Sequence, residues 1–380
     1  MNQRELNELR RRFRMDRNSI SRVFGCYVNS TKEVISWVDA SLGPMQQEEQ
    51  EMYLSLLKKS LSGTLGKNLL DIEFSTRQVA EGEEHKLLQA LRQSELQDQE
   101  ARERLCRTII DAMDMGESNY LILLAADNYD VPYHSKDGED QDDASDEVFR
   151  YFVCSVCPVK SPTLELRYDT DENEFHSSST GHVAASPEIG FLFPAFDNRS
   201  ANIYNALYYC KNPDMMHQEV IDAVFRVEPP LSAVEQKNIF DTALGDALEQ
   251  DCSFDMVQSV HEQLRTRIEE HKESRNPEKL ELSVEEVGGM LRSCGASLEQ
   301  VKTFQTKCTA EYGEGAGLTP GNLIESRKFE ITTPEVKISV SPENSYLIEA
   351  RVLNGRKYLL IPADDVVEVN GIGITIGEDK

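Results

Sequence analysis

Long apolar runs are missing from this sequence, as are a secretory leader and a regular cysteine framework. No run approaches the roughly 20 apolar residues of a membrane span, and the opening segment Met1–Leu6 has no hydrophobic leader core. Eight cysteines are scattered without the dense, even spacing of small secreted disulfide domains. We therefore expect a cytoplasmic protein that neither crosses a membrane nor is secreted.

Positive charge is scarce as well. The 380 residues include 40 Lys and Arg against 67 Asp and Glu, a formal net charge of −27. A field of this sign repels the phosphates of nucleic acids and of anionic lipids. We expect no membrane partner, and the charge disfavours nucleic acid as a partner. The hydrophobic fraction of 39% is nevertheless that of a folded protein with a sizeable core.

The first 25 residues depart from this acidic character, with seven arginines against three carboxylates and a local charge of +4. The arginines most concentrated in this block are Arg10, Arg11, Arg12, Arg14 and Arg17. Such a block either docks on the acidic body of its own protein or contacts a phosphate or a partner. Both interpretations stay open at the level of sequence.

Strand and helix patterns follow each other irregularly, which predicts an α+β fold with a mixed sheet flanked by helices. The predicted sheet strands lie within residues 26–38, 69–74, 120–126, 151–168 and 189–196. Helical patterns cover residues 3–14, the segment from Pro44 to Leu61, and residues 83–113 with a break near Ser94. The segment from Asp127 to Tyr133 is expected to leave its strand as a loop.

The domain prediction has three parts. A main domain covers residues 1–230 and includes the basic N-terminal helix. A helical region follows over 231–327, with a linker near 272–279 and capping boxes at Ser283 and Ser297. Residues 328–380 form a small antiparallel β module, in which Asn354-Gly355 and Asn370-Gly371 predict hairpin turns and Ile372, Ile374 and Ile376 close the sheet.

The stretch from Glu188 to Tyr209 combines a buried aromatic strand, ended by Pro194, with a polar turn. After the turn, apolar residues repeat at helical spacing from Ile203 to Cys210. This pattern would gather four polar residues around a helix N-terminus, where backbone N–H groups favour anions. They are Asp197, Arg199, Asn202 and Asn205. This polar turn is either the start of a capped helix, closed by an Asp–Arg ion pair, or a ligand site.

Lys67 lies in Gly63-Thr-Leu-Gly66-Lys67-Asn68, which looks at first like a phosphate loop. The glycine spacing is too short, and no Ser or Thr follows the lysine to hold magnesium. We expect a structural turn, although Lys67 can still contact a phosphate as an isolated charge.

Cys154 and Cys157 have the spacing of a metal or redox pair, but no second pair accompanies them. His176 and His182 are near enough in sequence to complete a four-ligand site. In a strand, however, residues three apart point to opposite faces. Buried free thiols, a metal site and a redox pair are the three readings, and we expect no metal and no cofactor.

Signals of catalysis are weak throughout. The sequence contains no nucleophile elbow, and His261-Glu262 lacks the second histidine of a metalloprotease helix. The acidic segment 137–147 lacks the ligand spacing of an EF-hand, and we expect it to be solvated. Asp127 and Asp130 could form an acid–base pair, with nothing to show a shared cleft. We name no catalytic residue, and Asp127 and Tyr129 join the candidate ligand-binding residues.

Short stretches along nearly the whole chain resemble a bacterial family known as a domain of unknown function. They include Gly25-Cys-Tyr-Val28, Tyr129-Asp-Val-Pro132, Cys154-Ser-Val-Cys-Pro-Val159 and the segment 191–209. The resemblance implies a bacterial, cytoplasmic protein and transfers no catalytic role. The C-terminal third, around Lys328-Phe-Glu-Ile-Thr-Thr333, is similar to the end of larger bacterial nucleoid-associated proteins, which implies association with DNA.

The resulting hypothesis is a cytoplasmic, non-enzymatic binding or interaction protein with an unknown protein or small-molecule partner. Two alternatives stay open. One is a nucleic-acid-binding protein that uses the basic block, and the other is an enzyme that acts on a phosphorylated small molecule through Lys67 and Arg199.

Overall fold

An eight-stranded antiparallel sheet forms the centre of the N-terminal part of the computed structural model. The structure describes residues 1–134, 140–141, 147–161, 164–179, 181–325, 328–363, 367–369 and 372–374. It divides into two units: residues 1–233 with 277–279, and residues 234–276 with 280–380. The predicted α+β class is confirmed. The finer division of the C-terminal residues into a helical region and a β module stays a prediction.

The strand order of the main sheet is β2-β1-β4-β7-β11-β14-β3, with β10 paired to β7. Its strands are β1 (Arg22–Val28), β2 (Val34–Ser41), β3 (Leu69–Glu73), β4 (Asn119–Val131), β7 (Glu147–Lys160), β10 (Val183–Ala184), β11 (Ile189–Phe193) and β14 (Asn205–Cys210). Each pair of these described strands is antiparallel, so the prediction of a mixed sheet is corrected. Neighbouring antiparallel strands need only short connections, whereas parallel ones require a crossover.

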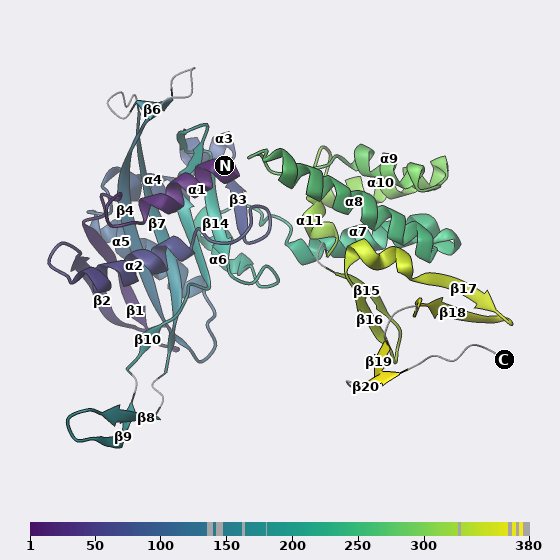
Figure 1. Cartoon of the computed structure of the whole chain (residues 1–380). Helices are drawn as coiled ribbons and strands as arrows, with labels where there is room; N and C mark the ends of the chain where they lie inside the picture. Colours follow the sequence, from purple (N-terminus) through teal and green to yellow (C-terminus); the bar gives the residue numbers. More distant parts are fainter. Residues whose placement is uncertain are drawn as a thin grey trace. The chain divides into compact units, whose positions relative to one another are not determined.

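Helices cover both faces of this sheet (Figure 1). On one face lie α1 (Gln3–Arg12) and α2 (Gln47–Lys59), whose Leu6 and Leu57 share an apolar cluster with Leu123 of β4. On the other face, α4 (Glu83–Gln93), α5 (Gln99–Ala112) and α6 (Gln218–Phe225) pack on Ile122 and Leu124. Successive residues of a strand point to opposite faces, so an apolar residue is required at almost every position. The short α3 (Thr76–Glu81) precedes α4.

Three two-stranded hairpins complete the first unit. They are β5 (Tyr133–His134) with β6 (Asp140–Gln141), β8 (Leu164–Asp169) with β9 (Glu174–Ser179), and β12 (Ala195–Asp197) with β13 (Ser200–Asn202). The acidic segment 137–147 lies largely outside the described residues, so its predicted solvation is not tested.

Three local predictions were wrong. The helix expected after Asp197 is instead the hairpin strand β13 followed by β14. β14 is buried on both faces, with Ala206 and Tyr208 in one cluster and Leu207 and Tyr209 in the other, and a two-sided apolar run does not distinguish strand from helix. β4 continues to Val131 rather than ending before Asp127, because β7 pairs with it along its whole length. Residues 164–168 belong to the β8–β9 hairpin and not to the main sheet.

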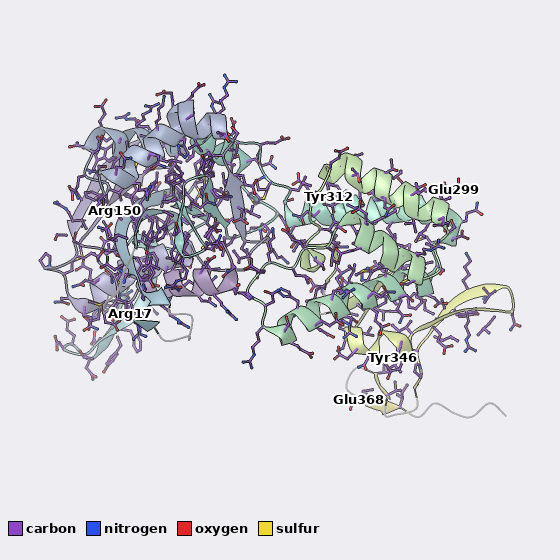
Figure 2. The ribbon with its side chains drawn as sticks, turned by 90° about the horizontal axis from the view of Figure 1, so that it is seen from above. Arg17, Arg150, Glu299, Tyr312, Tyr346 and Glu368 are labelled. Carbon is purple, nitrogen blue, oxygen red and sulfur yellow. The ribbon has the colours of Figure 1, made fainter. Side chains whose placement is uncertain are left out.

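Helices form the core of the second unit. They are α7 (Ala233–Leu248), the 3₁₀ turn η1 (Glu249–Asp251), α8 (Phe254–Ser274), α9 (Val284–Ser293), α10 (Leu298–Tyr312) and α11 (Pro320–Leu323). Glu299 and Tyr312 mark the two ends of α10 in Figure 2. The capping boxes predicted at Ser283 and Ser297 are confirmed, each hydroxyl accepting a bond from the backbone N–H three residues on.

Short antiparallel hairpins follow these helices. They are β15 (Phe329–Thr332) with β16 (Lys337–Val340), β17 (Glu349–Leu353) with β18 (Arg356–Leu360), and β19 (Val367–Val369) with β20 (Ile372–Ile374), with the 3₁₀ helix η2 (Pro342–Leu347) between the first two hairpins. The turn predicted at Asn354-Gly355 joins β17 to β18, as expected. The turn at Asn370-Gly371 and the residue Ile376 lie outside the described residues.

Candidate functional site: an arginine-lined cleft on α1

The helix α1 is fixed by a capping box at its start and by an apolar face. The side-chain oxygen of Asn2 accepts bonds from the backbone N–H of Arg4 at 3.0 Å and of Glu5 at 3.1 Å. The Glu5 carboxylate accepts in return from the Asn2 N–H at 2.8 Å. Leu6 and Leu9 are fully buried against the sheet. The opposite face of the helix therefore lies at the surface.

That opposite face is basic. Arg4, Asn7 and Arg11 recur at a spacing of three and four residues, which places them on one side of a helix. Arg4 and Arg11 are exposed, and within the described part of the chain neither guanidinium has a hydrogen-bonding or ionic partner. The interpretation that the basic block simply docks on the protein's own body therefore does not account for these two arginines.

Asp127 anchors the loop that follows α1 to the sheet. Its carboxylate, only 2% exposed, accepts bonds from Arg12 Nε at 3.0 Å and Nη2 at 3.1 Å, from the Ser19 N–H and Oγ at 2.7 Å each, and from the Tyr151 hydroxyl at 2.8 Å. Burial is the first cause that raises the pKa of Tyr151, which keeps this hydroxyl a donor. Asp127 thus serves as a structural anchor, and its oxygens are already occupied.

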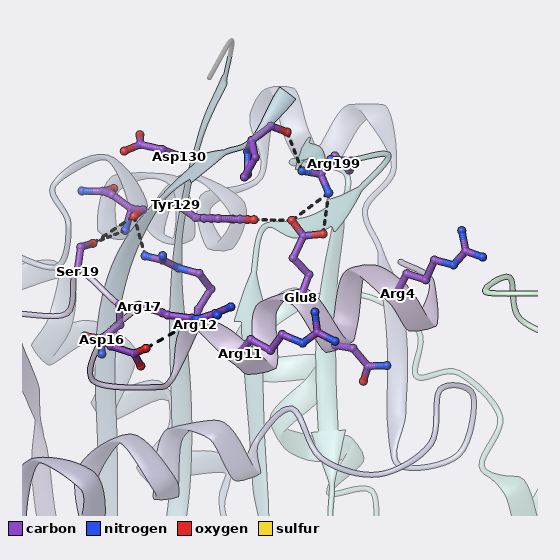
Figure 3. A pocket seen from close by; sticks show the side chains of 14 residues that line it. Arg4, Glu8, Arg11, Arg12, Asp16, Arg17, Ser19, Tyr129, Asp130 and Arg199 are labelled. Carbon is purple, nitrogen blue, oxygen red and sulfur yellow. Dashed lines mark hydrogen bonds and ion pairs between the residues drawn. The ribbon is translucent and has the colours of Figure 1, made fainter. Parts of the chain in front are cut away.

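Glu8 links the helix to Tyr129 and Arg199 (Figure 3). Arg199 Nη1 donates to both carboxylate oxygens of Glu8, at 3.0 and 2.8 Å, and Nη2 donates to the Pro132 carbonyl at 2.8 Å. The Tyr129 hydroxyl also donates to Glu8. Burial, followed by this hydrogen bond, raises the pKa of Tyr129. The phenol therefore stays protonated and acts as a donor at neutral pH.

A tight turn presents Arg199 to this site. Asp197 pairs with Ser200 across the β12–β13 hairpin, which leaves Asn198 and Arg199 as a two-residue loop. Both have positive φ, 50° and 59°, as a hairpin turn of this length requires. Asparagine suits this conformation, whereas arginine does so at a cost. The turn is thus held by its surroundings, including the bond from the Arg199 N–H to Glu5 at 3.2 Å.

These elements enclose an open cleft of about 810 Å³. Five arginines and three carboxylates line it, a net charge of +2 on a chain whose total is −27. The charged lining residues are Arg4, Arg11, Arg12, Arg17, Arg199, Glu8, Asp16 and Asp130. Arg12 and Arg199 are engaged by Asp127 and Glu8, and Arg17 lies 3.9 Å from Asp16. Among the described residues, Arg4 and Arg11 are thus the two arginines of the lining without an ionic partner, and Asp130 is the one carboxylate without one.

The polar corner predicted from sequence is split by the structure. Asn202 Nδ2 donates to Asp197 Oδ2 at 2.7 Å and to Asn205 Oδ1 at 2.9 Å, and the amino group of Met1 forms an ion pair with Asp197. None of these three predicted residues lines the cleft, whereas Arg199 does. The anion site expected at a helix N-terminus is absent here because these described residues form a hairpin.

The other predicted cations have different environments. Lys67 is exposed in the turn before β3 and does not line the cleft. Arg10 donates to the carbonyls of Leu61 at 2.7 Å and Gly63 at 3.0 Å, which makes it part of the packing of α1. Arg14 is exposed and lies 3.3 Å from Asp16. Of the predicted arginines, Arg11, Arg12 and Arg17 thus line the cleft.

Cys154 and Cys157 are buried free thiols. Burial raises the pKa of both, that of Cys157 to about 12, which disfavours the reactive thiolate. His176 pairs with Glu172 at 3.0 Å, and the His182 ring lies 6.3 Å from that of Tyr27. Among the residues that the structure describes, no His, Cys, Asp or Glu cluster could hold a metal ion.

Sequence reasoning missed Glu8, Ser19 and Tyr151. The one available signal was Glu8, a glutamate in the middle of an arginine-rich helix. A carboxylate at such a position is expected to pair with a cation. The partners of these residues are far away in the chain, 191 residues for Glu8 and Arg199. Only the folded sheet shows which partner each one has.

Comparison with known proteins assigns the chain to one family. The family model described as "Domain of unknown function (DUF4317)" matches residues 1–372, so the chain belongs to this family, as the resemblance predicted. No curated protein matches the chain. Within the described ranges, none of the helices combines the length and the apolar character needed to pass through a bilayer.

Proposed function

We propose that this chain is a cytoplasmic bacterial binding protein that takes a small anionic ligand in the cleft on α1. The observation that carries the proposal is the pair of exposed guanidinium groups of Arg4 and Arg11, which have no partner among the described residues, in a positively charged cleft of an acidic protein. Arginine binds carboxylates and phosphates through two parallel hydrogen bonds. The free state of all eight cysteines supports a reducing compartment.

The ligand has more than one anionic group. Arg4 and Arg11 are seven residues apart, which is about 10 Å along a helix. One phosphate group cannot contact both helix positions without the two side chains folding toward each other. The Tyr129 hydroxyl and Arg199, both bonded to Glu8, form the inner wall of the cleft.

Direct titration of the full chain tests this proposal. Inorganic tripolyphosphate and citrate serve as probes in isothermal titration calorimetry. A double variant Arg4→Glu with Arg11→Glu should bind the better probe at least about tenfold more weakly, because charge-assisted hydrogen bonds are replaced by repulsion. The double variant Arg104→Glu with Arg107→Glu is the matched control, because it makes the same change of net charge. Arg104 and Arg107 are exposed arginines of α5 in the same unit and do not line the cleft.

Binding that the Arg104/Arg107 double variant weakens as much as the Arg4/Arg11 double variant does would reduce the effect to net charge and overturn the proposal. Absence of binding of either probe to the wild type at millimolar concentration would also overturn it. Release of orthophosphate from bound tripolyphosphate would move the assignment from binding protein to enzyme.

Nucleic acid is the second candidate, favoured by the exposed row of Arg4, Arg11 and Arg17. It predicts that labelled duplex DNA binds at low salt, that the affinity falls steeply as salt is added, and that the Arg4/Arg11 double variant loses it. The charge of −27 opposes this reading. Duplex that does not bind at low salt, where electrostatic attraction is strongest, removes it.

A further inference from the structure

A second concave surface lies in the other unit, between two β-hairpins that follow the helices. The hairpin β17–β18 turns at Asn354 and Gly355, both at positive φ. Ala350 faces Leu359 across it, and Val352 faces Lys357. These four residues share one face of the hairpin, because partners in register point to the same side.

The opposite wall comes from the hairpin β15–β16. Phe329 of β15 is buried, and its ring packs edge-to-face on those of Phe254 and His261 of α8, with centroid distances of 6.0 and 5.9 Å. This contact anchors the hairpin to the helices of its unit. Val336 and Ile338 then line, with the four residues of β17–β18, a groove of about 630 Å³.

The walls of this groove are mainly apolar and incompletely covered. Val352 is 66% exposed and Val336 is 53% exposed. Each hairpin is a two-stranded sheet, so on the described residues every strand has one edge whose N–H and C=O groups lack a neighbouring strand. Such edges accept an added strand, and two-stranded sheets gain stability from a third.

The charged side chains that line the groove are both cationic, although the chain as a whole is strongly acidic. Arg351 forms an ion pair with Glu349 at 2.5 Å. Lys357 lines the groove and, in the part of the chain that the structure describes, has no ionic partner. A second copy of this chain would bring the same cations to the same face, so repulsion disfavours it as the occupant.

We propose that this groove binds an extended segment of a partner protein, in which apolar side chains alternate with acidic ones. The segment adds as a strand to a free hairpin edge, its apolar side chains fill the aliphatic walls, and a carboxylate meets Lys357. Single-stranded nucleic acid fits this surface less well. Five of its nine lining residues are aliphatic and Tyr358 is the single aromatic one, so successive bases would find no row of rings on which to stack.

A charge-reversal experiment on the full chain tests this proposal. The probes are two fluorescein-labelled hexapeptides, Glu-Val-Glu-Val-Glu-Val and Lys-Val-Lys-Val-Lys-Val, followed by fluorescence anisotropy. The wild type should bind the acidic peptide at least about tenfold more tightly, and Lys357→Glu should reverse that preference. Arg356→Glu is the matched control: it makes the same change of charge one residue away, at a residue that does not line the groove, and should alter affinity less than about twofold.

Each other outcome overturns the proposal. Absence of saturable binding of either peptide does so, as does an equal effect of Arg356→Glu and Lys357→Glu. Loss of acidic-peptide binding in the Arg4/Arg11 double variant would place the peptide in the α1 cleft, which leaves the proposed function intact and removes this one. If the wild type binds labelled oligothymidylate and Lys357→Glu does not, the groove is assigned to nucleic acid. If the wild type is a dimer and Lys357→Glu is a monomer, the groove is assigned to a second copy.

Discussion

Replacement of Asp127 by alanine is the sharpest test of how the cleft is built. The carboxylate is 2% exposed and accepts five hydrogen bonds from Arg12, Ser19 and Tyr151. Alanine removes the acceptor and leaves three kinds of donor in place. One of them is a charged guanidinium whose side chain is 17% exposed, and another is the Tyr151 hydroxyl, whose residue is 2% exposed.

The expected loss of stability depends on the donors that Asp127→Ala leaves without an acceptor. Removal of one partner of a buried ion pair typically costs about 3–5 kcal/mol, because the remaining charge is desolvated and unpaired. An orphaned buried hydroxyl adds about 1–3 kcal/mol. Arg12 can recover some hydration at the edge of the cleft, which lowers the total. We expect Asp127→Ala to lower the free energy of unfolding of the first unit by about 4 kcal/mol.

Urea unfolding followed by tryptophan fluorescence measures this quantity. The chain has a single tryptophan, Trp37 of β2, which belongs to the first unit, so the signal reports that unit alone. Asp127→Asn is an informative companion variant. Its amide keeps the size of the side chain but turns an NH₂ toward existing donors, so most of the loss should remain.

Asp130→Ala is the matched control. Asp130 is an exposed carboxylate on the same strand that also lines the cleft, and its removal should change stability by no more than about 0.5 kcal/mol. If Asp127→Ala lowers the free energy of unfolding by less than about 1 kcal/mol, the Arg12–Asp127 pair behaves like an exposed salt bridge. The account of Asp127 as the buried anchor of the loop after α1 would then be refuted.

Three further predictions concern other parts of the chain. Gly25→Ala would bring a Cβ to 1.8 Å from the Ile122 carbonyl oxygen, so the same urea assay should show a loss of about 3 kcal/mol or more, and a loss below about 1 kcal/mol would contradict the close strand approach. The exposed Cys252 should react with a thiol reagent in the native protein, whereas Cys154, buried and with a raised pKa, should react only after unfolding; equal rates would contradict this burial. Burial lowers the pKa of His261 in the folded state, so its contribution to stability is fully present above the unfolded value of about 6.5 and is lost as pH falls toward the folded value. Thermal unfolding at about pH 7.5 and about pH 5.5 should therefore show that His261→Gln loses less stability on acidification than the wild type, and equal losses would refute the assignment.

Much of the secondary structure could be predicted from residues that are close together in the sequence. The capped starts of α9 and α10 are set by a serine and a carboxylate or amide three residues on, which interact within one turn of helix. The Asn354-Gly355 hairpin needs only two residues that tolerate positive φ. The opposite faces of Cys154 and Cys157 follow from the period of a strand, and with them the interpretation as buried thiols.

The failures occurred where burial on two sides removes the periodic signal. Residues 203–210 were expected to form a helix because apolar residues recur there at helical spacing, yet β14 lies in the sheet with both faces covered. The strand β4 likewise extends through Asp127, a polar residue that seemed to end it. Its carboxylate is acceptable in the interior only because Arg12, Ser19 and Tyr151 satisfy it.

The family membership, the α+β class and the position of the basic helix could thus be read from the order of the residues. The cleft itself could not. Arg12 meets Asp127 across 115 positions, and Glu8 meets Arg199 across 191. Pairings over such distances depend on the register of β4 in the sheet and on the turn that presents Arg199. Tertiary structure therefore decided which arginines became structural and which two of α1, Arg4 and Arg11, have no ionic partner among the described residues.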